Sequence, residues 1–474
     1  MPNQGDRAQN PIVRCGKLLS LAALVSLLVL PLGQAAWADE DHGKREDHGR
    51  TKGEAGADRA LRLLTLVPVP VNAANTTAGA MYSFDISFVD QATQTYYLGD
   101  RSNKAVDAVD AETGQFLEQI SATPAFAGAA ASTSVSGPNG VVAAFPWLFA
   151  TDAKSRVVSF DLRTTPPTQV SDVTTSPGDP FRADELAYDP QHGTLLVINN
   201  ADTPPFATLI SVDKNTGKLT VGTRLTFDTA HTGINAQNGA EQPVWDADLN
   251  RFFLSIPQIG GPAGGPAAGQ PLPDGAIIKI NPFSATVEAS YPVHLCGPAG
   301  LTLGPNQDLF IGCNTVSDTQ GNVWNPAGTV PADPRDVIID AKTGNIDANV
   351  FGVGAGDEVT FNAGDGNYYA TGSGSPQRPL PAATAQGSTP AGVVDAKDRA
   401  LLQLFPTFNV PAVTTGTAQH PAGTSHSIAA NSHNNLVFVP LPANNTFLSP
   451  DGKDNCLTGC IGVFGHPDES AATD

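Results

Sequence analysis

Charged residues are scarce in this sequence, and basic residues are the scarcer kind. Only 15% of the 474 residues are charged, and 26 Lys and Arg stand against 46 Asp and Glu, which gives a formal net charge of −20. A net-negative field repels nucleic acid and anionic membrane surfaces alike. We therefore expect no nucleic acid and no membrane surface among the partners, and cations are the more natural ligands.

The sequence also lacks the short motifs that identify common enzyme classes. It contains no G-x-S-x-G nucleophile elbow, no H-E-x-x-H zinc site, no Walker loop and no C-x-x-C-H haem site. The tryptophan-docking repeats of calcium-dependent PQQ enzymes are missing as well. No motif in the chain therefore assigns a reaction by itself.

Glycine and proline, in contrast, are abundant, and they separate short strand-like segments. The chain has 47 Gly and 39 Pro, a proportion that favours many turns over helices. Residues 84–114 show apolar residues in alternation, interrupted by polar turns, and end in the hairpin sequence Asp-x-x-Thr-Gly at 110–114. The same hairpin sequence recurs at 213–217 and 340–344.

The strand unit recurs along the chain, and the number of copies predicts the fold. Seven copies indicate an all-β, seven-bladed β-propeller over residues 59–466. The last copy has only three strands, so the isolated apolar segment 60–71 is predicted to supply its fourth strand and close the ring. The insertions at 258–275 and 374–391 are expected to be loops, and residues 467–474 a disordered tail.

The N-terminal residues 1–38 have the pattern of a secretory signal peptide. Arg14 and Lys17 precede an apolar run that ends in the small-x-small sequence Ala-Trp-Ala at 36–38. The run is too short to favour a permanent membrane span, and the charged residues 39–58 are expected to form a disordered linker. The mature protein is therefore predicted to be exported, periplasmic or secreted, without a membrane span.

Four cysteines follow the predicted signal peptide, in two close pairs. Cys296 and Cys313 flank a predicted hairpin, and Cys456 and Cys460 would close a small loop. An even number of cysteines in an exported protein favours two disulfides, although the sequence does not fix their pairing. A four-thiolate metal site is the alternative, but its C-x2-C knuckle is absent.

Polar residues recur at one equivalent position, five residues before the turn that ends each inner strand. Six of the seven predicted blades carry one there, the exception being Ala299; they are Asp85, Asn139, Asp184, Glu241, Asp357 and His426. Glu185 and Glu358 come one residue later, so the strand register decides which residue of each acidic pair points inward. Because inner strands line the central channel of a propeller, these side chains are expected to converge at one mouth.

Carboxylates that converge in a low-dielectric channel repel one another unless a cation neutralises them. We therefore predict a divalent-metal site with the ligands Asp85, Asn139, Glu185, Glu241, Glu358 and His426. Oxygen ligands favour Ca²⁺, with Mg²⁺ or Mn²⁺ as alternatives, and the imidazole leaves a transition metal open. The competing interpretation is a polar channel whose acids only bind backbone amides or buried water.

The repeats resemble those of the seven-bladed propellers grouped as YVTN-type, NHL-type and SMP-30/gluconolactonase-like proteins. The resemblance rests on YYLGD at 96–100, FATD at 149–152, the Asp-x-x-Thr-Gly hairpins and GPNGV at 137–141. In SMP-30-type lactonases the Asn of Pro-Asn-Gly ligates a divalent cation, so the resemblance implies this role for Asn139. Those lactonases have a Glu in the first blade, where this chain has Asp85.

Two classes of function fit these observations. The first is a metal-dependent, lactonase-like hydrolase acting on a small carbonyl substrate, with His426, Glu185 and Glu358 as catalytic residues that move protons. A propeller lyase, which abstracts a proton next to a carbonyl, is a close relative of this possibility. The second is a non-catalytic propeller that binds a small molecule in the central channel, or a protein partner through its loops.

Overall fold

The computed structural model describes residues 60–261, 274–324, 334–354, 356–371 and 387–467. The predicted signal peptide (1–38) and linker (39–58) lie outside these residues, as do most of the insertions at 258–275 and 374–391 and of the predicted tail at 467–474. Within the described residues, no helix has the length and apolar character needed to cross a membrane.

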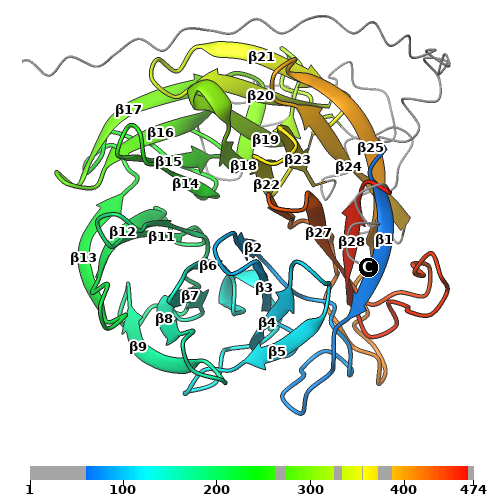
Figure 1. Cartoon of the computed structure of the whole chain (residues 1–474). Coiled ribbons are helices and arrows are strands. Elements are labelled where there is room, and N and C mark those ends of the chain that lie inside the picture. Colours follow the sequence, from blue (N-terminus) through cyan, green and yellow to red (C-terminus); the bar gives the residue numbers. More distant parts are fainter. Residues whose placement is uncertain (1–59, 262–273, 325–333, 355, 372–386, 468–474) are drawn as a thin grey trace, which may run out of the picture. The chain divides into compact units, whose positions relative to one another are not determined.

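The described residues form seven four-stranded antiparallel sheets, arranged as the blades of a propeller around a central axis (Figure 1). Blade one comprises β2 (Ser87–Asp90), β3 (Thr95–Asp100), β4 (Ala105–Asp110) and β5 (Phe116–Ile120). Blade two comprises β6 (Val141–Ala144), β7 (Trp147–Asp152), β8 (Arg156–Asp161) and β9 (Thr168–Thr174). Blade three comprises β10 (Leu186–Asp189), β11 (Thr194–Asn199), β12 (Phe206–Val212) and β13 (Leu219–Thr226). Blade four comprises β14 (Pro243–Asp246), β15 (Arg251–Ile256), β16 (Gly275–Asn281) and β17 (Thr286–Val293). Blade five comprises β18 (Cys296–Leu303), β19 (Asp308–Val316), β20 (Arg335–Asp340) and β21 (Ile346–Phe351). Blade six comprises β22 (Val359–Asn362), β23 (Asn367–Ala370), β24 (Gly387–Asp395) and β25 (Ala400–Asn409). Helical structure in the described residues is limited to two short 3₁₀ turns, η1 (Thr133–Val135) and η2 (Pro305–Gln307).

The seventh blade joins the two ends of the propeller and confirms the predicted closure. It contains β26 (Ala429–Asn431), β27 (Leu436–Leu441) and β28 (Cys460–Gly465), with β1 (Arg62–Pro68) as its outer strand. β1 runs antiparallel to β28, and Figure 1 shows the two side by side. Pairing with β1 covers the backbone groups of β28 that would otherwise form an exposed sheet edge.

The hydrophobic core lies between neighbouring blades, because each sheet has two faces to cover. One cluster packs Phe149 of blade two against Leu195 and Ile210 of blade three, all of them fully buried. Another packs Phe253 of blade four against Leu309 of blade five. Stacking of blades therefore supplies the buried surface that a single blade cannot provide alone.

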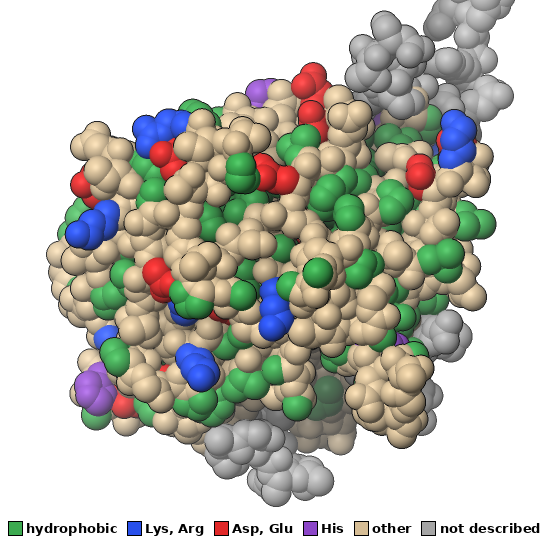
Figure 2. Space-filling model, turned by 90° about the horizontal axis from the view of Figure 1, so that it is seen from below, with side chains coloured by type: hydrophobic (Ala, Val, Ile, Leu, Met, Phe, Trp, Pro, Cys, Tyr) green, Lys and Arg blue, Asp and Glu red, His purple; other side chains and the backbone are tan. Residues whose placement is uncertain are grey.

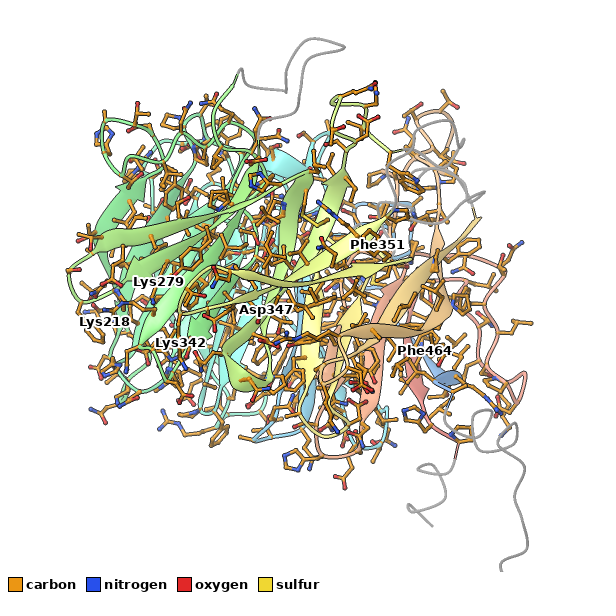
Figure 3. All side chains as sticks on the ribbon, turned by 90° about the horizontal axis from the view of Figure 1, so that it is seen from above. Lys218, Lys279, Lys342, Asp347, Phe351 and Phe464 are labelled. Atoms are coloured by element: carbon orange, nitrogen blue, oxygen red, sulfur yellow. A yellow bond between two sulfur atoms is a disulfide. The ribbon has the colours of Figure 1, made fainter. Side chains whose placement is uncertain are left out.

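The outer strands alternate between exposed and partly buried residues, as expected at the rim. β17 shows this alternation along almost its entire length. Figure 3 shows β21 on the outside of its blade, with Asp347 and the exposed side chain of Phe351 labelled. On the face shown in Figure 2, the described Lys and Arg side chains are scattered and form no continuous patch.

The Asp-x-x-Thr-Gly hairpins share one turn geometry, which explains why the sequence repeats. The Oδ1 atom of Asp110 accepts hydrogen bonds from the backbone N–H groups of Glu112 (2.9 Å) and Thr113 (2.8 Å). Gly114 then adopts φ 72°, a left-handed conformation that favours glycine. Asp340 and Gly344 repeat this arrangement in blade five.

Both predicted disulfides are present. Cys296 and Cys313 join the adjacent strands β18 and β19, with a Cα–Cα distance of 5.2 Å. Cys456 and Cys460 close the loop that leads into β28.

Candidate functional site

The residues predicted to converge lie at the start of the inner strands, at one mouth of the axis. Each of them lies within a few residues before the start of an inner strand. These strands are β2, β6, β10, β14, β22 and β26. In blade five the inner strand β18 starts earlier, and Ala299 lies within it. The structure therefore brings the predicted positions of six blades to the same end of the channel.

Asp85 is neutralised by basic residues of the chain itself. Its carboxylate forms an ion pair with Arg101, lies 3.7 Å from Nη1 of Arg182, and contacts Nε2 of His426 at 3.1 Å. Burial opposes ionisation of Asp85, but these three groups together hold its pKa below the ordinary value. Asp85 is therefore an ionised carboxylate whose charge is already balanced.

His426 is held between two hydrogen-bond acceptors. Nδ1 lies 2.7 Å from the carbonyl oxygen of Thr424, and Nε2 faces the Asp85 carboxylate. Nδ1 also lies 3.0 Å from Oγ1 of Thr424, and an imidazolium could donate from both nitrogens, to Thr424 and to Asp85. Burial lowers the pKa of His426, but the Asp85 carboxylate outweighs it and leaves the pKa raised.

Asn139 uses its whole amide group inside the protein. Its Oδ1 accepts from Nε of Arg101 at 2.9 Å. Its Nδ2 donates to the carbonyl oxygens of Ser136 (3.1 Å) and Ala183 (2.9 Å). The Asn139 side chain therefore positions the Arg101 guanidinium beside Asp85.

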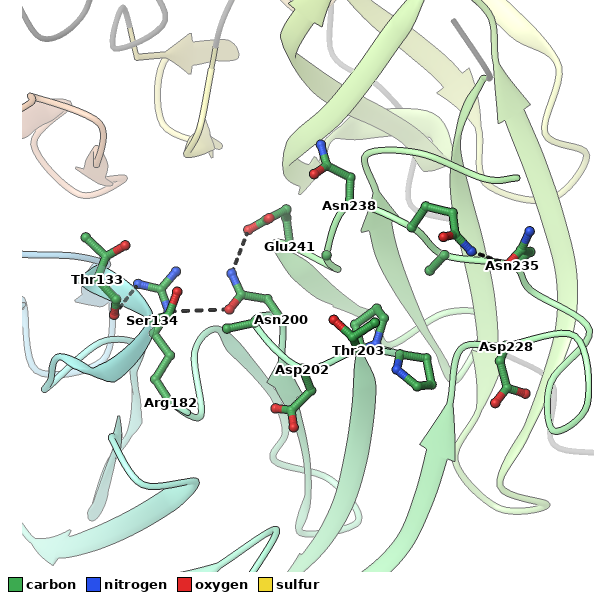
Figure 4. A pocket seen from close by; sticks show the side chains of 16 residues that line it. Thr133, Ser134, Arg182, Asn200, Asp202, Thr203, Asp228, Asn235, Asn238 and Glu241 are labelled. Atoms are coloured by element: carbon green, nitrogen blue, oxygen red, sulfur yellow. Dashed lines mark hydrogen bonds between the residues drawn. The ribbon is translucent and has the colours of Figure 1, made fainter. Parts of the chain in front are cut away.

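Arg182 connects this group to the next acids around the axis. Its Nη2 pairs with Oδ2 of Asp184 at 2.6 Å, and its Nε donates to Oδ1 of Asn200 at 3.4 Å. Asn200 in turn reaches Oε2 of Glu241 at 3.5 Å, as Figure 4 shows. Oδ1 of Asp184 is buried without a hydrogen-bond partner. Burial raises the pKa of Asp184 to about 7, although Arg182 partly offsets this effect.

Asp184 and the acids beside it on the axis also repel one another. We call Asp184, Glu185, Glu241, Asp357 and Glu358 the axial carboxyl cluster. Burial raises the pKa of Glu185 well above its ordinary value, and repulsion from Glu358 and Glu241 adds to the effect. Burial likewise raises the pKa values of Glu241 and Glu358 strongly, with repulsion from neighbouring acids in second place.

Hydrogen bonding inside the cluster is incomplete. Nε2 of Gln242 donates to Oε2 of Glu358 at 2.8 Å, and Nδ2 of Asn314 donates to Oδ1 of Asp357 at 3.2 Å. Oε2 of Glu185, in contrast, is buried and has no hydrogen-bond partner. An unpartnered buried carboxyl oxygen is costly, so a group that satisfies it would bind favourably.

Both members of each acidic pair lie at the mouth of the axis, in different surroundings. Asp184 pairs with Arg182, whereas Glu185 lines a cavity that lies between the inner strands. In blade six, Asp357 and Glu358 are held by different amide side chains.

Sequence reasoning missed the two arginines. Arg101 follows the YYLGD segment at the end of β3, and Arg182 lies two residues before Asp184. A search for basic residues beside the aligned acids would have pointed to both. Gln242, one residue after Glu241, was missed in the same way.

The metal ligands predicted from the sequence lie together, but not as a coordination sphere. Among the described residues, no group of three or more His, Cys, Asp and Glu side chains is placed so that it could hold a metal ion. Asn139 and His426 make the internal hydrogen bonds described above. The divalent-metal site, with Ca²⁺ as its preferred ion, stays a prediction.

Two cavities adjoin the cluster. A polar pocket of about 570 Å³ opens beside it, lined by Arg182, Asn200, Asp202, Asn238 and Glu241 among others (Figure 4). Glu241 is only partly buried, since it also faces this pocket. The second cavity, of about 410 Å³, follows the axis between the inner strands and includes Glu185 and Gln242 in its lining.

Comparisons with known proteins support the fold and go no further. No family model matches this chain, and no curated protein matches it either. Among solved structures, hydrazine synthase from Kuenenia stuttgartiensis is similar, with a TM-score of 0.52, 11% sequence identity, and coverage of 78% of this chain and 94% of that one. At this identity the likeness shows the propeller fold alone. Membership of the YVTN, NHL and SMP-30 group stays a resemblance.

Proposed function

We propose that this protein is an exported, non-catalytic propeller that binds a small cationic ligand at the axial carboxyl cluster. The observation that carries the proposal is Oε2 of Glu185, a buried carboxyl oxygen without a partner among acids that repel one another. A ligand that brings a positive charge and a hydrogen-bond donor would satisfy this oxygen and reduce the repulsion.

The distribution of charge around the axis favours a cation as the ligand. Six carboxyl groups, those of Asp85 and the cluster, stand against the side chains of Arg101, Arg182 and His426. All three of these bases contact Asp85, and Arg182 also contacts Asp184. The largest charge effects on Glu185 and Glu358 come from other acids, so these two carboxyl groups gain most from a bound cation.

Binding without catalysis fits the state of His426. A general base needs a free lone pair, and an imidazolium with both nitrogens directed at acceptors has none. In that form His426 supports the Asp85 carboxylate and does not take a proton from a substrate.

A metal-dependent, lactonase-like hydrolase is the second candidate. The observation that favours it is the strongly raised pKa of Glu185 and Glu358, two of the residues predicted to be catalytic. A carboxyl that stays protonated at neutral pH can serve as a general acid. In this reading a divalent cation would occupy the cluster after its side chains rearrange.

Export is part of the proposal. All four cysteines after the predicted signal peptide are paired, as in proteins of oxidising compartments. The test is to express the full chain and to determine the N-terminus and the location of the mature protein. The mature protein is expected outside the cytoplasm, with an N-terminus after residue 38. Retention of the intact chain in the cytoplasm would contradict export.

The binding test is a calorimetric titration of the mature protein. The panel contains Ca²⁺, Mg²⁺, Mn²⁺ and primary ammonium ions of increasing size. At least one cation is expected to bind, with a loss of affinity of tenfold or more in Glu185→Gln, which corresponds to about 1.4 kcal/mol. Asp336→Asn is the matched control, because Asp336 is also a buried carboxyl but lies outside the cluster.

The outcomes separate the two candidates. Failure of the whole panel to bind, or binding that Glu185→Gln leaves unchanged, would refute the proposed site. Stoichiometric binding of a divalent cation, together with EDTA-sensitive hydrolysis of a lactone, would favour the second candidate over the first.

A further inference from the structure

The axial cavity differs from the cluster in its chemistry. Inner strands of all seven blades line it, over a volume of about 410 Å³. The lining includes the apolar side chains of Ile86, Phe88, Trp245 and Phe361, each of which is only partly buried although it lies on an inner strand or just before one. These side chains thus present an apolar wall to the cavity.

The two ends of the cavity are unequal. At the end where the inner strands begin, Glu185 and Gln242 contribute to the lining. At the other end the lining includes Gln91 and the exposed Pro190, where the inner strands finish. The cavity is therefore a mainly apolar channel that runs from Gln91 and Pro190 to Glu185 of the axial carboxyl cluster.

A bare divalent ion does not make use of such a channel. Apolar walls cannot replace the water that a small ion loses, whereas they gain contact area from an apolar ligand. The unpartnered Oε2 of Glu185 at the inner end calls for a hydrogen-bond donor. An apolar body that ends in one amino group meets both requirements, and the aromatic side chains on the wall also favour an ammonium group.

We propose that the ligand of the cluster is a primary amine with an apolar body, which lies in the axial cavity with its ammonium group at Glu185. The inference rests on the proposed function, since it names the class of cation that the cluster binds. The ammonium group and the Glu185 carboxylate form a neutral pair, and any proton that the carboxyl group held passes to solvent. No bond to carbon forms or breaks.

The first test is a homologous series of ligands. Methylamine, n-butylamine, n-hexylamine and phenethylamine are titrated into the mature protein, with 1-hexanol as the uncharged counterpart of n-hexylamine. Affinity is expected to rise about fourfold for each added CH₂ group, as burial of a methylene predicts. 1-Hexanol is expected to bind at least tenfold more weakly than n-hexylamine.

Variants and fluorescence locate the site. Phe88→Ala is expected to lower the affinity for n-hexylamine at least fivefold. Phe283→Ala, at a surface position that is 60% exposed, should leave this affinity unchanged. Binding of phenethylamine is expected to change tryptophan emission, and Trp245→Phe should remove the change although Trp147 and Trp324 remain. Circular dichroism of each variant checks that it has folded.

The results distinguish this inference from the proposal beneath it. If amines bind in a way that depends on Glu185 but with the same affinity at every chain length, the apolar part of the ligand is refuted and the cation site is retained. Equal binding of 1-hexanol and n-hexylamine would overturn the role of the ammonium group. Absence of binding by every cation would overturn both.

Discussion

At the scale of single residues, the two buried arginines decide how the axis is charged. Arg101 is almost completely buried, and its guanidinium group is fixed by Asp85 and Asn139. Burial lowers the pKa of Arg101, and the Asp85 carboxylate opposes that shift. The pair is therefore costly to break from one side, because a buried Asp85 carboxylate would keep only Arg182 and His426 as basic neighbours.

Removal of one partner should cost more than removal of both. Arg101→Gln is expected to lower the free energy of unfolding by about 3–5 kcal/mol, as for other buried ion pairs. In the double variant Asp85→Asn/Arg101→Gln, the two amides can bond to each other, so the loss should be smaller than in Arg101→Gln alone. Urea denaturation of the natural protein, Asp85→Asn, Arg101→Gln and the double variant measures this difference, and simple additivity of the two substitutions would contradict the account.

Asp336 should make stability depend on pH. It is fully buried, its Oδ1 accepts from the backbone N–H of Cys313, and burial raises its pKa to about 7. Because the folded protein holds this proton more tightly than the unfolded chain, the associated stability is lost as pH rises from about 4 to about 7. Asp336→Asn is thus expected to be more stable than the natural protein near pH 8 and little changed near pH 4. Thermal unfolding at both pH values checks this, and a variant that is less stable near pH 8 would contradict it.

At the scale of elements, the closing strand β1 is the part most open to test. Leu66 in this strand is 2% exposed and belongs to the cluster between blades six and seven. Leu66→Ala is expected to lower the free energy of unfolding by about 2–5 kcal/mol, as for other buried leucines. Val71→Ala, just after the strand and 39% exposed, serves as the control. Equal effects of the two substitutions would show that β1 does not hold the ring closed.

The disulfide across β18 and β19 should stabilise blade five. Cys296 and Cys313 are separated by 17 residues, and a closed loop of this size stabilises by about 3 kcal/mol when the bridge forms. The variant with both cysteines replaced by Ala is expected to lose about that amount in urea denaturation. The Cys456–Cys460 bridge closes a loop of only 4 residues, so its removal should cost less.

The elements were predictable because their signals are local. Alternation of apolar residues and the repeated Asp-x-x-Thr-Gly turn depend on a few neighbouring positions, and both carry over to strands and hairpins in the structure. The fourth strand of the last blade was also predictable, since a missing strand at one end matched an unpaired apolar segment at the other.

The site was only partly predictable, for a physical reason. Aligned positions on repeats showed which acids would meet, but not what else would reach them. Arg101 and Arg182 come from segments outside the inner strands, and their side chains reach the axis through contacts distant in sequence. The sequence therefore predicted a ring of acids whose charge a bound cation would balance. In the structure, Arg101 and Arg182 balance part of that charge.

At the scale of the whole molecule, the propeller places two environments in series along one axis. The inner strands start at a polar mouth with the carboxyl cluster and end at an apolar channel lined by aromatic side chains. Inner strands of all seven blades line the channel, whereas blades three, four and six supply the carboxyl cluster, so the two meet only in the closed ring. A ligand with one charged end and one apolar end matches this order.

The most direct test of the central claim is proton release on binding. Phenethylamine is titrated calorimetrically into the mature protein near pH 7, in two buffers that differ in their enthalpy of ionisation. Since burial raises the pKa of Glu185 and a bound cation opposes that shift, binding is expected to release protons, and Glu185→Gln to abolish the release. Binding with the same enthalpy in both buffers, or release that persists in Glu185→Gln, would contradict the account.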